Sequence, residues 1–211
     1  MAITAGMVKE LREMTGAGMM DCKKALTETN GDMDAAVEVL RKSGAAKMEK
    51  KQSRIAAEGI ARVAVNGNVA VVAEVNSETD FVAKNAIFQE FVQFVADTAL
   101  KSSVEKAGDG EDVCDILGLK SELEEKTLTI GEKLSIRRFA KISGDCVASY
   151  THGGGRIGVI VAADGASGDA VQEALTNVAM QIAALKPQYT SDSEVSAEYI
   201  ELSLIHILTL P

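Results

Sequence analysis

The strongest constraint on the fold is the stretch from Val69 to Lys84, where an apolar run ends in a cluster of turn and helix-capping residues. Val69–Val75 (VAVVAEV) is rich in β-branched residues and nearly continuous in apolar character, as a buried strand should be. Asn66-Gly-Asn68 precedes it and is typical of a tight hairpin turn, which makes Gly59–Val65 the expected partner strand. The pattern predicts a buried β-hairpin that leads directly into a helix.

The end of this strand carries an unusual aromatic residue. Asn76, Ser77 and Thr79 suit a turn and a helix cap, and Asp80 suits the first turn of a helix. Phe81 then follows at an expected surface turn, in a chain that has only 5 Phe, 3 Tyr and no Trp. Two interpretations stay open: Phe81 packs back onto its own sheet, or it forms a protruding apolar wedge that enters a partner.

The first 55 residues are predicted to form a helical domain followed by a linker. Helical spacing and caps predict helices from Ala5 to about Met14, from Met19 to Thr29 and from Met33 to about Lys42, with Ser43-Gly44 ending the third. Ala45–Arg54 is rich in lysine and is interpreted as a linker or a solvated helical extension. Three short helices joined by tight turns form a compact bundle that is marginal alone.

Met19 and Met20 are adjacent at the start of the second predicted helix. Two successive positions on a helix cannot both face the bundle, so one methionine is expected inward and the other on the surface. A flexible thioether on a surface is suited to an adaptable apolar contact with a partner.

The rest of the chain is predicted to form an α/β core of two related halves, residues 56–140 and 141–200, which makes the whole chain α+β. The order of patterns is a hairpin with helices, then a three-strand antiparallel meander with a helix. The elements after the hairpin are expected at Phe88–Ala99 (helix), Lys101–Gly110 (loop), Asp112 to about Lys126 (helix), β-like chain from Thr127, Leu134–Ile142, Cys146–Thr151 and Ile157–Ala162 (strands) and Ala170–Leu185 (helix).

Composition excludes several classes of function. The net charge of −9 argues against a nucleic-acid-binding protein, because phosphate binding needs a basic surface. The charge is uneven: residues 1–55 hold 10 Lys and Arg against 8 Asp and Glu, whereas the remainder holds 12 against 23. No apolar run approaches the roughly 18 residues of a membrane helix, and the N-terminus lacks a signal-peptide layout. A cytoplasmic protein with no membrane contact is expected.

The remaining candidate sites offer little catalytic chemistry. Thr15–Leu26 begins like a glycine-rich phosphate cradle, but no strand precedes it and no Gly-Lys-Ser/Thr follows. The glycines after His152 lie between predicted strands, which favours a hairpin tip over a phosphate site. The cysteines are widely spaced, so we expect reduced thiols that serve mainly in packing. His152 has no partner at metal-ligand or catalytic-triad spacing, so we expect neither a metal, nor a cofactor, nor enzymatic activity. The three cysteines are Cys22, Cys114 and Cys146.

Four motifs together resemble bacterial elongation factor Ts. They are Thr15–Leu26 (TGAGMMDCKKAL), Thr79–Lys84 (TDFVAK), Ile130-Gly131 with Arg137-Arg138, and His152–Val159, and they match in order over roughly residues 3–199. The resemblance implies a non-catalytic guanine nucleotide exchange factor for the GTPase elongation factor Tu, which acts in translation elongation during protein biosynthesis. It also implies that the first helices form a UBA-like (ubiquitin-associated-like) domain.

The resemblance also implies which residues touch elongation factor Tu. The turn at Thr79, Asp80, Phe81 and Val82 pushes Phe81 between two helices of Tu and disturbs its magnesium and phosphate site. Asp80 is expected to cap the helix and to fix the direction of Phe81. The other implied contacts are Met19, Met20 and Lys23 in the N-terminal domain, and Ile130, Gly131 and His152 in the core.

The end of the chain departs from the family pattern after about Ile200. Leu202–Pro211 (LSLIHILTLP) is uncharged and β-prone, so residues 201–211 are interpreted as an aberrant tail or the result of truncation. The expected partner is Tu, GDP-bound and nucleotide-free, and a homodimer is a second candidate assembly. Two other functions stay open: a non-exchange binding module that uses the Met19/Met20 surface with Phe81 in its core, and a small-molecule enzyme that uses His152.

Overall fold

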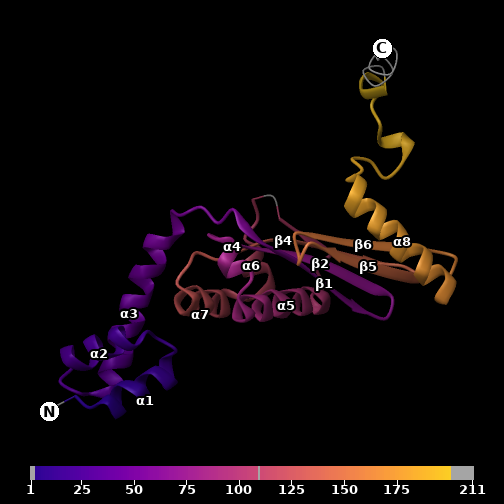
Figure 1. The fold of residues 1–211 in the computed structure, drawn as a ribbon. Coiled ribbons are helices and arrows are strands. Elements are labelled where there is room, and N and C mark those ends of the chain that lie inside the picture. Colours follow the sequence, from indigo (N-terminus) through magenta and orange to yellow (C-terminus); the bar gives the residue numbers. More distant parts are fainter. Residues whose placement is uncertain (1–2, 109, 201–211) are drawn as a thin grey trace.

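The computed structural model describes residues 3–108 and 110–200, and it combines N-terminal helices with antiparallel sheets (Figure 1). This confirms the predicted α+β class. The helical bundle consists of α1 (Ala5–Thr15), α2 (Met19–Glu28) and α3 (Met33–Gln52). Its core buries one apolar face of each helix, with Leu11, Cys22, Leu26 and Ala36 among the buried side chains.

Helix α3 is longer than the sequence pattern predicts, because it continues through Ser43-Gly44 to Gln52. The predicted stop at Ser43-Gly44 is therefore wrong, and the helical extension is the correct interpretation of the lysine-rich segment. Gly44 is instead a point of close approach: a Cβ there would lie 3.1 Å from Leu128 Cδ1 in α7 (Lys120–Ile130). Glycine inside a helix costs about 1 kcal/mol against alanine, and here it lets two helices meet.

The main sheet has the order β1-β2-β4-β3 within the described residues. β1 (Glu58–Asn66) and β2 (Val69–Ser77) form the predicted hairpin, and Gly67 at its turn has φ +57°. β4 (Ser135–Ser143) pairs with the other side of β2, and the short β3 (Lys106–Ala107) pairs with β4. Helix α5 (Ala86–Lys101) covers one face of this sheet. The main core includes Val71, Ala73, Val75, Phe88, Phe91, Val92, Val95, Ile136 and Phe139.

β5 (Cys146–His152) and β6 (Ile157–Ala163) form a separate two-stranded sheet that packs against α8 (Asp169–Leu185). The predicted three-strand meander is wrong, because β4 pairs with β2 and buries its apolar side chains in the main core. The β5–β6 pair lies on the face of the main sheet opposite α5 (Figure 1). Gly158 makes this approach close, since a Cβ there would lie 2.9 Å from Val72 Cγ2.

Two further predictions in the region between the sheets need correction. The helix expected from Asp112 to Lys126 is split into α6 (Val113–Leu117) and α7 by Gly118, which has φ +67°. Helix α7 then runs to Ile130, so residues 127–130 are helical rather than β-like. The remaining elements are α4 (Asp80–Ala83) and a 3-10 turn at Asp192–Glu194. Within the described residues, no helix has the length and apolar character needed to cross a membrane.

Candidate functional site

The Phe81 turn (Ser77–Lys84) projects an aromatic side chain from the end of β2. Phe81 is 79% exposed, while Ala83 is buried and Val82 is half-buried against the main core. The one-turn helix α4 thus directs its small and branched residues inward and its aromatic residue outward. This arrangement contradicts the interpretation in which Phe81 packs back onto its own sheet.

The cap of α4 is Thr79, whose Oγ1 accepts a hydrogen bond from the Val82 amide at 3.4 Å. The expectation that Asp80 caps the helix is therefore wrong. Asp80 lies in the first turn, as the pattern also predicts, and its carboxylate accepts from Lys84 Nζ at 2.8 Å. The hydrogen bond and charge of Lys84 hold the pKa of Asp80 below its ordinary value. Lys84 Nζ also lies 6.0 Å from the centre of the Phe81 ring, within range of a cation–π contact.

The base of the Phe81 turn is held by a carboxylate from a distant part of the sequence. Glu132 Oε2 accepts the backbone amides of Glu78 at 3.1 Å and Thr79 at 3.0 Å. Glu132 Oε1 accepts the Thr79 hydroxyl at 2.7 Å. Three hydrogen bonds from one half-buried carboxylate therefore fix the backbone directly before α4.

The segments Glu78–Thr79 and Glu132–Lys133 hydrogen-bond to each other in both directions. We call these four residues the clasp. Glu78 Oε1 accepts the Lys133 amide at 2.5 Å, and both Glu78 oxygens lie 3.3 Å from Arg54 Nη1. The Lys133 amide, aided by Arg54, keeps the pKa of Glu78 below its ordinary value despite some opposing desolvation. Lys133 Nζ donates to the Arg54 carbonyl at 2.8 Å, which connects the clasp to the segment that follows α3.

The structure brings the other predicted core residues to the same end of the main sheet. Gly131 has φ +89° and ends α7 one residue before Glu132, and Ile130 packs against the main core. His152 ends β5 on the surface, and its Nδ1 lies 3.0 Å from the phenol oxygen Oη of Tyr150. The turn after His152 is attached to β1, because the Ala61 amide donates to the Gly155 carbonyl at 2.6 Å.

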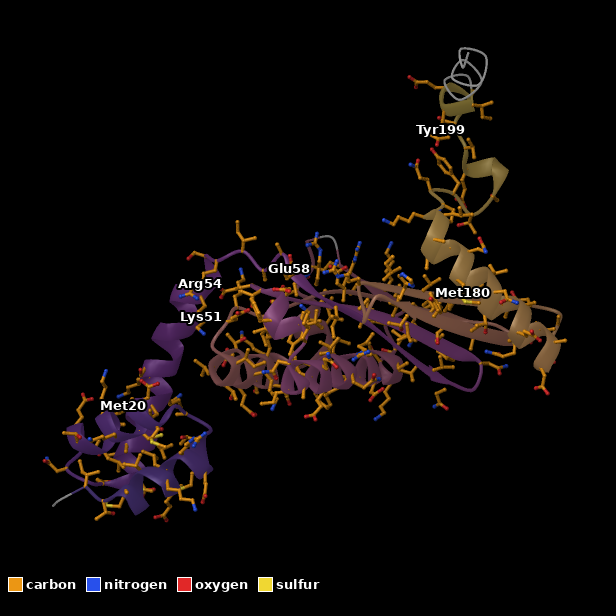
Figure 2. The ribbon with its side chains drawn as sticks, in the orientation of Figure 1. Met20, Lys51, Arg54, Glu58, Met180 and Tyr199 are labelled. Atoms are coloured by element: carbon orange, nitrogen blue, oxygen red, sulfur yellow. The ribbon has the colours of Figure 1, made fainter. Side chains whose placement is uncertain are left out.

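Met19, Met20 and Lys23 lie on α2, in the helical bundle and apart from the Phe81 turn (Figures 1 and 2). Met19 is 60% exposed and Met20 is 65% exposed. The expectation that one of them faces the bundle is wrong, because Cys22 and Leu26 fill the inward positions of α2. The bundle therefore exposes two adjacent thioether side chains on its surface.

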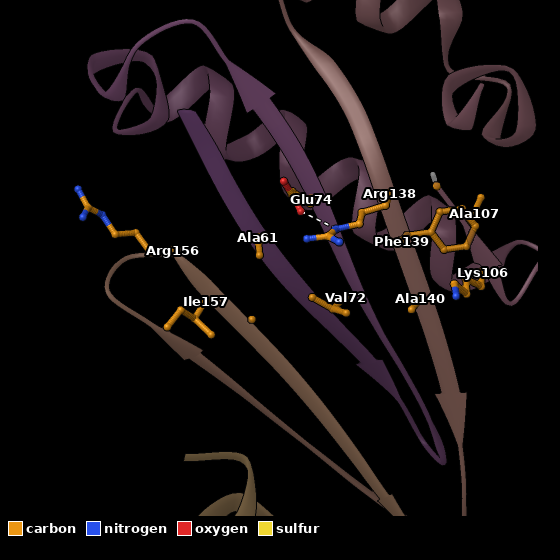
Figure 3. A pocket seen from close by; sticks show the side chains of 12 residues that line it. Ala61, Val72, Glu74, Lys106, Ala107, Arg138, Phe139, Ala140, Arg156 and Ile157 are labelled. Carbon is orange, nitrogen blue, oxygen red and sulfur yellow. Dashed lines mark hydrogen bonds and ion pairs between the residues drawn. The ribbon is translucent and has the colours of Figure 1, made fainter. Parts of the chain in front are cut away.

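A groove of about 450 Å³ with both charged and apolar lining residues lies between the main sheet and β6 (Figure 3). Its ion pairs explain the double arginine of the motif: Glu74 lies 2.7 Å from Arg138 Nε and 3.7 Å from Arg137 Nε. A shift in strand register beside Glu74 lets both arginines reach the same carboxylate. The arginines therefore have internal partners. In the part of the chain that the structure describes, no three His, Cys, Asp or Glu side chains form a cluster suited to a metal ion.

Sequence reasoning did not identify Glu132 or Glu78 as part of the site. The available signal was position alone, since Glu132 directly follows the Ile130-Gly131 motif and Glu78 directly precedes Thr79. The three cysteines are free and buried, as expected of packing thiols.

Comparison with known proteins identifies a family. The family model described as "Elongation factor TS" matches residues 78–206, which include Glu78–Lys84 of the Phe81 turn and Glu132. Proteins named elongation factor Ts from Salmonella agona, Salmonella newport and Salmonella typhi are each 48% identical to this chain over 203 residues. These matches cover 94% of this chain and 67% of each relative.

Proposed function

Because the chain belongs to the elongation factor Ts family of translation elongation factors, we propose that it is a guanine nucleotide exchange factor for elongation factor Tu. In this role it binds GDP-bound Tu, promotes release of GDP and leaves nucleotide-free Tu ready to bind GTP. The observation that carries the finer mechanism is the exposed Phe81 on a turn whose base is held by hydrogen bonds.

Phe81 acts as an apolar wedge. Full burial of a phenylalanine side chain contributes about 1.5–3 kcal/mol, and most of this gain is still available because the ring is 79% exposed in the free protein. A GTPase holds its nucleotide through loop amides and a bridging magnesium ion. A wedge that enters between two helices of Tu and shifts them weakens the magnesium and phosphate contacts together.

The exchange follows from linkage and requires no covalent chemistry. If this protein weakens the binding of GDP to Tu, GDP weakens the binding of this protein to Tu by the same coupling free energy. Nucleotide and exchange factor therefore displace each other, and the complex with both is transient. The protein makes and breaks no bond, which distinguishes it from an enzyme.

The remaining contacts divide between two surfaces. Met19, Met20 and Lys23 on α2 form a contact for the nucleotide domain of Tu, and both methionines are exposed as such a contact requires. Ile130, Gly131 and His152 accompany the Phe81 turn in the core contact. The UBA-like domain (residues 1–55) and the two core halves (56–140 and 141–200) act as the units of this interaction, and a homodimer is a further assembly to be tested.

The decisive experiment is release of a fluorescent GDP analogue from Tu with magnesium present, in the presence of catalytic amounts of this chain. The parent should accelerate release, and Phe81→Ala should slow it by at least ~10-fold while keeping the far-UV circular dichroism of the parent. Glu90→Ala, a change at an exposed position of α5, serves as the matched control. No acceleration by a folded parent contradicts the exchange function, and equal rates for parent and Phe81→Ala contradict the wedge.

A second candidate function is a protein-binding module without exchange activity. The exposed Met19 and Met20 side chains favour it, because they supply an adaptable apolar surface independent of Phe81. In that case this chain binds Tu or another partner without changing the rate of GDP release, and Met20→Ala abolishes binding while Phe81→Ala does not.

A further inference from the structure

We propose that Glu132 is a positioning residue for exchange, which holds the Phe81 turn in its projecting conformation. The proposal rests on the proposed function and extends it to a residue that acts through its hydrogen bonds with Glu78 and Thr79. It is carried by the three hydrogen bonds from Glu132 to the two residues directly before α4.

The first argument concerns the hydroxyl of Thr79, which has two partners. A carboxylate can only accept, so the Thr79 proton must point toward Glu132 Oε1 at 2.7 Å. The Val82 amide can only donate, and it meets the remaining lone pairs of the same oxygen at 3.4 Å. Glu132 thus orients the Thr79 hydroxyl so that its lone pairs face the amide that needs a cap.

The second argument concerns the length of α4, which has four residues, Asp80–Ala83. A single helical turn is unstable by itself, since nucleation fixes several dihedral angles for one hydrogen bond. The direction of Phe81 therefore depends on the contacts at the start of the turn, and Glu132 supplies three of them. Without this carboxylate the turn loses three of the contacts that hold Phe81 in its projecting direction.

The third argument is that the clasp is built from both sides. Glu132 accepts from the backbone of Glu78–Thr79, and Glu78 accepts from the backbone of Lys133 at 2.5 Å. The segments are more than fifty residues apart in sequence, yet each supplies a carboxylate to the backbone of the other. Removal of Glu132 leaves the Glu78–Lys133 bond in place, so the loss should affect the conformation of the turn more than the fold as a whole.

The test compares Glu132→Ala and Glu132→Gln with the parent, and with both changes in the Phe81→Ala background. Release of the fluorescent GDP analogue from Tu is measured at saturating concentrations of each variant, together with the concentration that gives half the maximal rate. Glu173→Ala, an exposed carboxylate on α8, is the matched control. Amide hydrogen exchange over residues 77–84 reports the loss of the Glu132 hydrogen bonds directly.

A positioning role predicts that Glu132→Ala lowers the maximal rate by ~10-fold or more, as expected for the loss of a charged hydrogen bond. Glu132→Gln, which keeps one carbonyl acceptor, should recover part of that rate. In the Phe81→Ala background the same change should cost less than ~2-fold, because there is no wedge left to position. Hydrogen exchange in residues 77–84 should accelerate while the rest of the main sheet stays protected.

Several results would overturn the proposal. If Glu132→Ala keeps the parental maximal rate while Phe81→Ala is slow, the exchange function stands and the positioning role is wrong. If Glu132→Ala costs the same factor with and without Phe81, the residue acts by general stability or by its own contact with Tu. If the folded parent itself does not accelerate release, the proposed function fails first, and hydrogen exchange alone decides whether Glu132 holds the turn.

Discussion

Two phenylalanines seven residues apart provide the sharpest test of the Phe81 turn. Phe81 is 79% exposed and Phe88 is fully buried in the main core. Truncating a buried phenylalanine to alanine costs about 3–5 kcal/mol, which is the expected loss of unfolding free energy for Phe88→Ala. Phe81 buries only about a fifth of its surface, so the same scale gives about 0.6–1 kcal/mol. The better helix propensity of alanine offsets about half of that loss.

Urea unfolding followed by circular dichroism measures both variants against the parent. Phe88→Ala should lower the midpoint strongly, and its Tm should fall by about 6–20 °C at the usual 2–4 °C per kcal/mol for a chain of this size. Phe81→Ala should stay within about 1 kcal/mol of the parent, with an unchanged urea slope. A loss above about 2 kcal/mol for Phe81→Ala would refute the projecting side chain, and every argument for a wedge would fall with it.

Three further predictions concern the backbone and two titrating groups. In urea unfolding, Gly155→Ala should destabilise the protein by about 2 kcal/mol more than Gly154→Ala. Both glycines have positive φ, but a Cβ at Gly155 would also lie 2.9 Å from a β1 side chain. Equal losses of unfolding free energy would contradict this close approach. Burial raises the pKa of Cys114 to about 11, so its alkylation by iodoacetamide should be slow at pH 8.5 and rise toward pH 11. Because the folded pKa exceeds the unfolded one, the contribution of Cys114 to stability should fall as pH rises through this range, and Cys114→Ala should reduce the slope. The pKa of Glu78 is held below its ordinary value of 4.5, so its stabilising contribution is present at neutral pH and is lost as pH falls below 4.5 through the folded pKa. Glu78→Gln should show a smaller decrease in unfolding free energy than the parent between pH 5.5 and pH 3.5; an unchanged decrease would argue against the bond to Lys133.

Local patterns in the sequence predicted the elements that depend on local chemistry. The hairpin followed from β-branched runs around Asn66-Gly-Asn68, and α5 followed from the spacing of Phe88, Phe91, Val92 and Val95. The strand-to-helix turn was also predicted, with Asp80 in the first turn. The sequence does not predict the direction of the Phe81 side chain, because a phenylalanine that follows a strand is compatible both with burial in the core and with an exposed wedge.

The pairing of strands that are far apart in the sequence cannot be predicted from local patterns in the same way. The pattern of β4 shows that its Ile136 and Phe139 need a core, but it does not show whether β2 or β5 supplies the neighbouring strand. Glycine gives a similar ambiguity, since Gly44 stays inside α3 whereas Gly118 ends α6. The sequence does not indicate Glu132, because two of its three hydrogen bonds come from backbone amides, which every sequence contains, and the third comes from Thr79, 53 residues away.

Helix α3 affects how binding at one candidate contact surface influences binding at the other. Its 20 residues span about 30 Å, and its last part, residues 45–52, takes up most of the lysine-rich segment that the sequence predicts as either a linker or a helical extension. A flexible tether would let a docked bundle search many positions, whereas a helical spacer restricts the search to a narrow arc. Once the bundle binds, the effective concentration of Phe81 at its own target is then set by the geometry of α3. Inserting glycines into α3 should therefore reduce the avidity of the protein for Tu even though neither contact surface is altered.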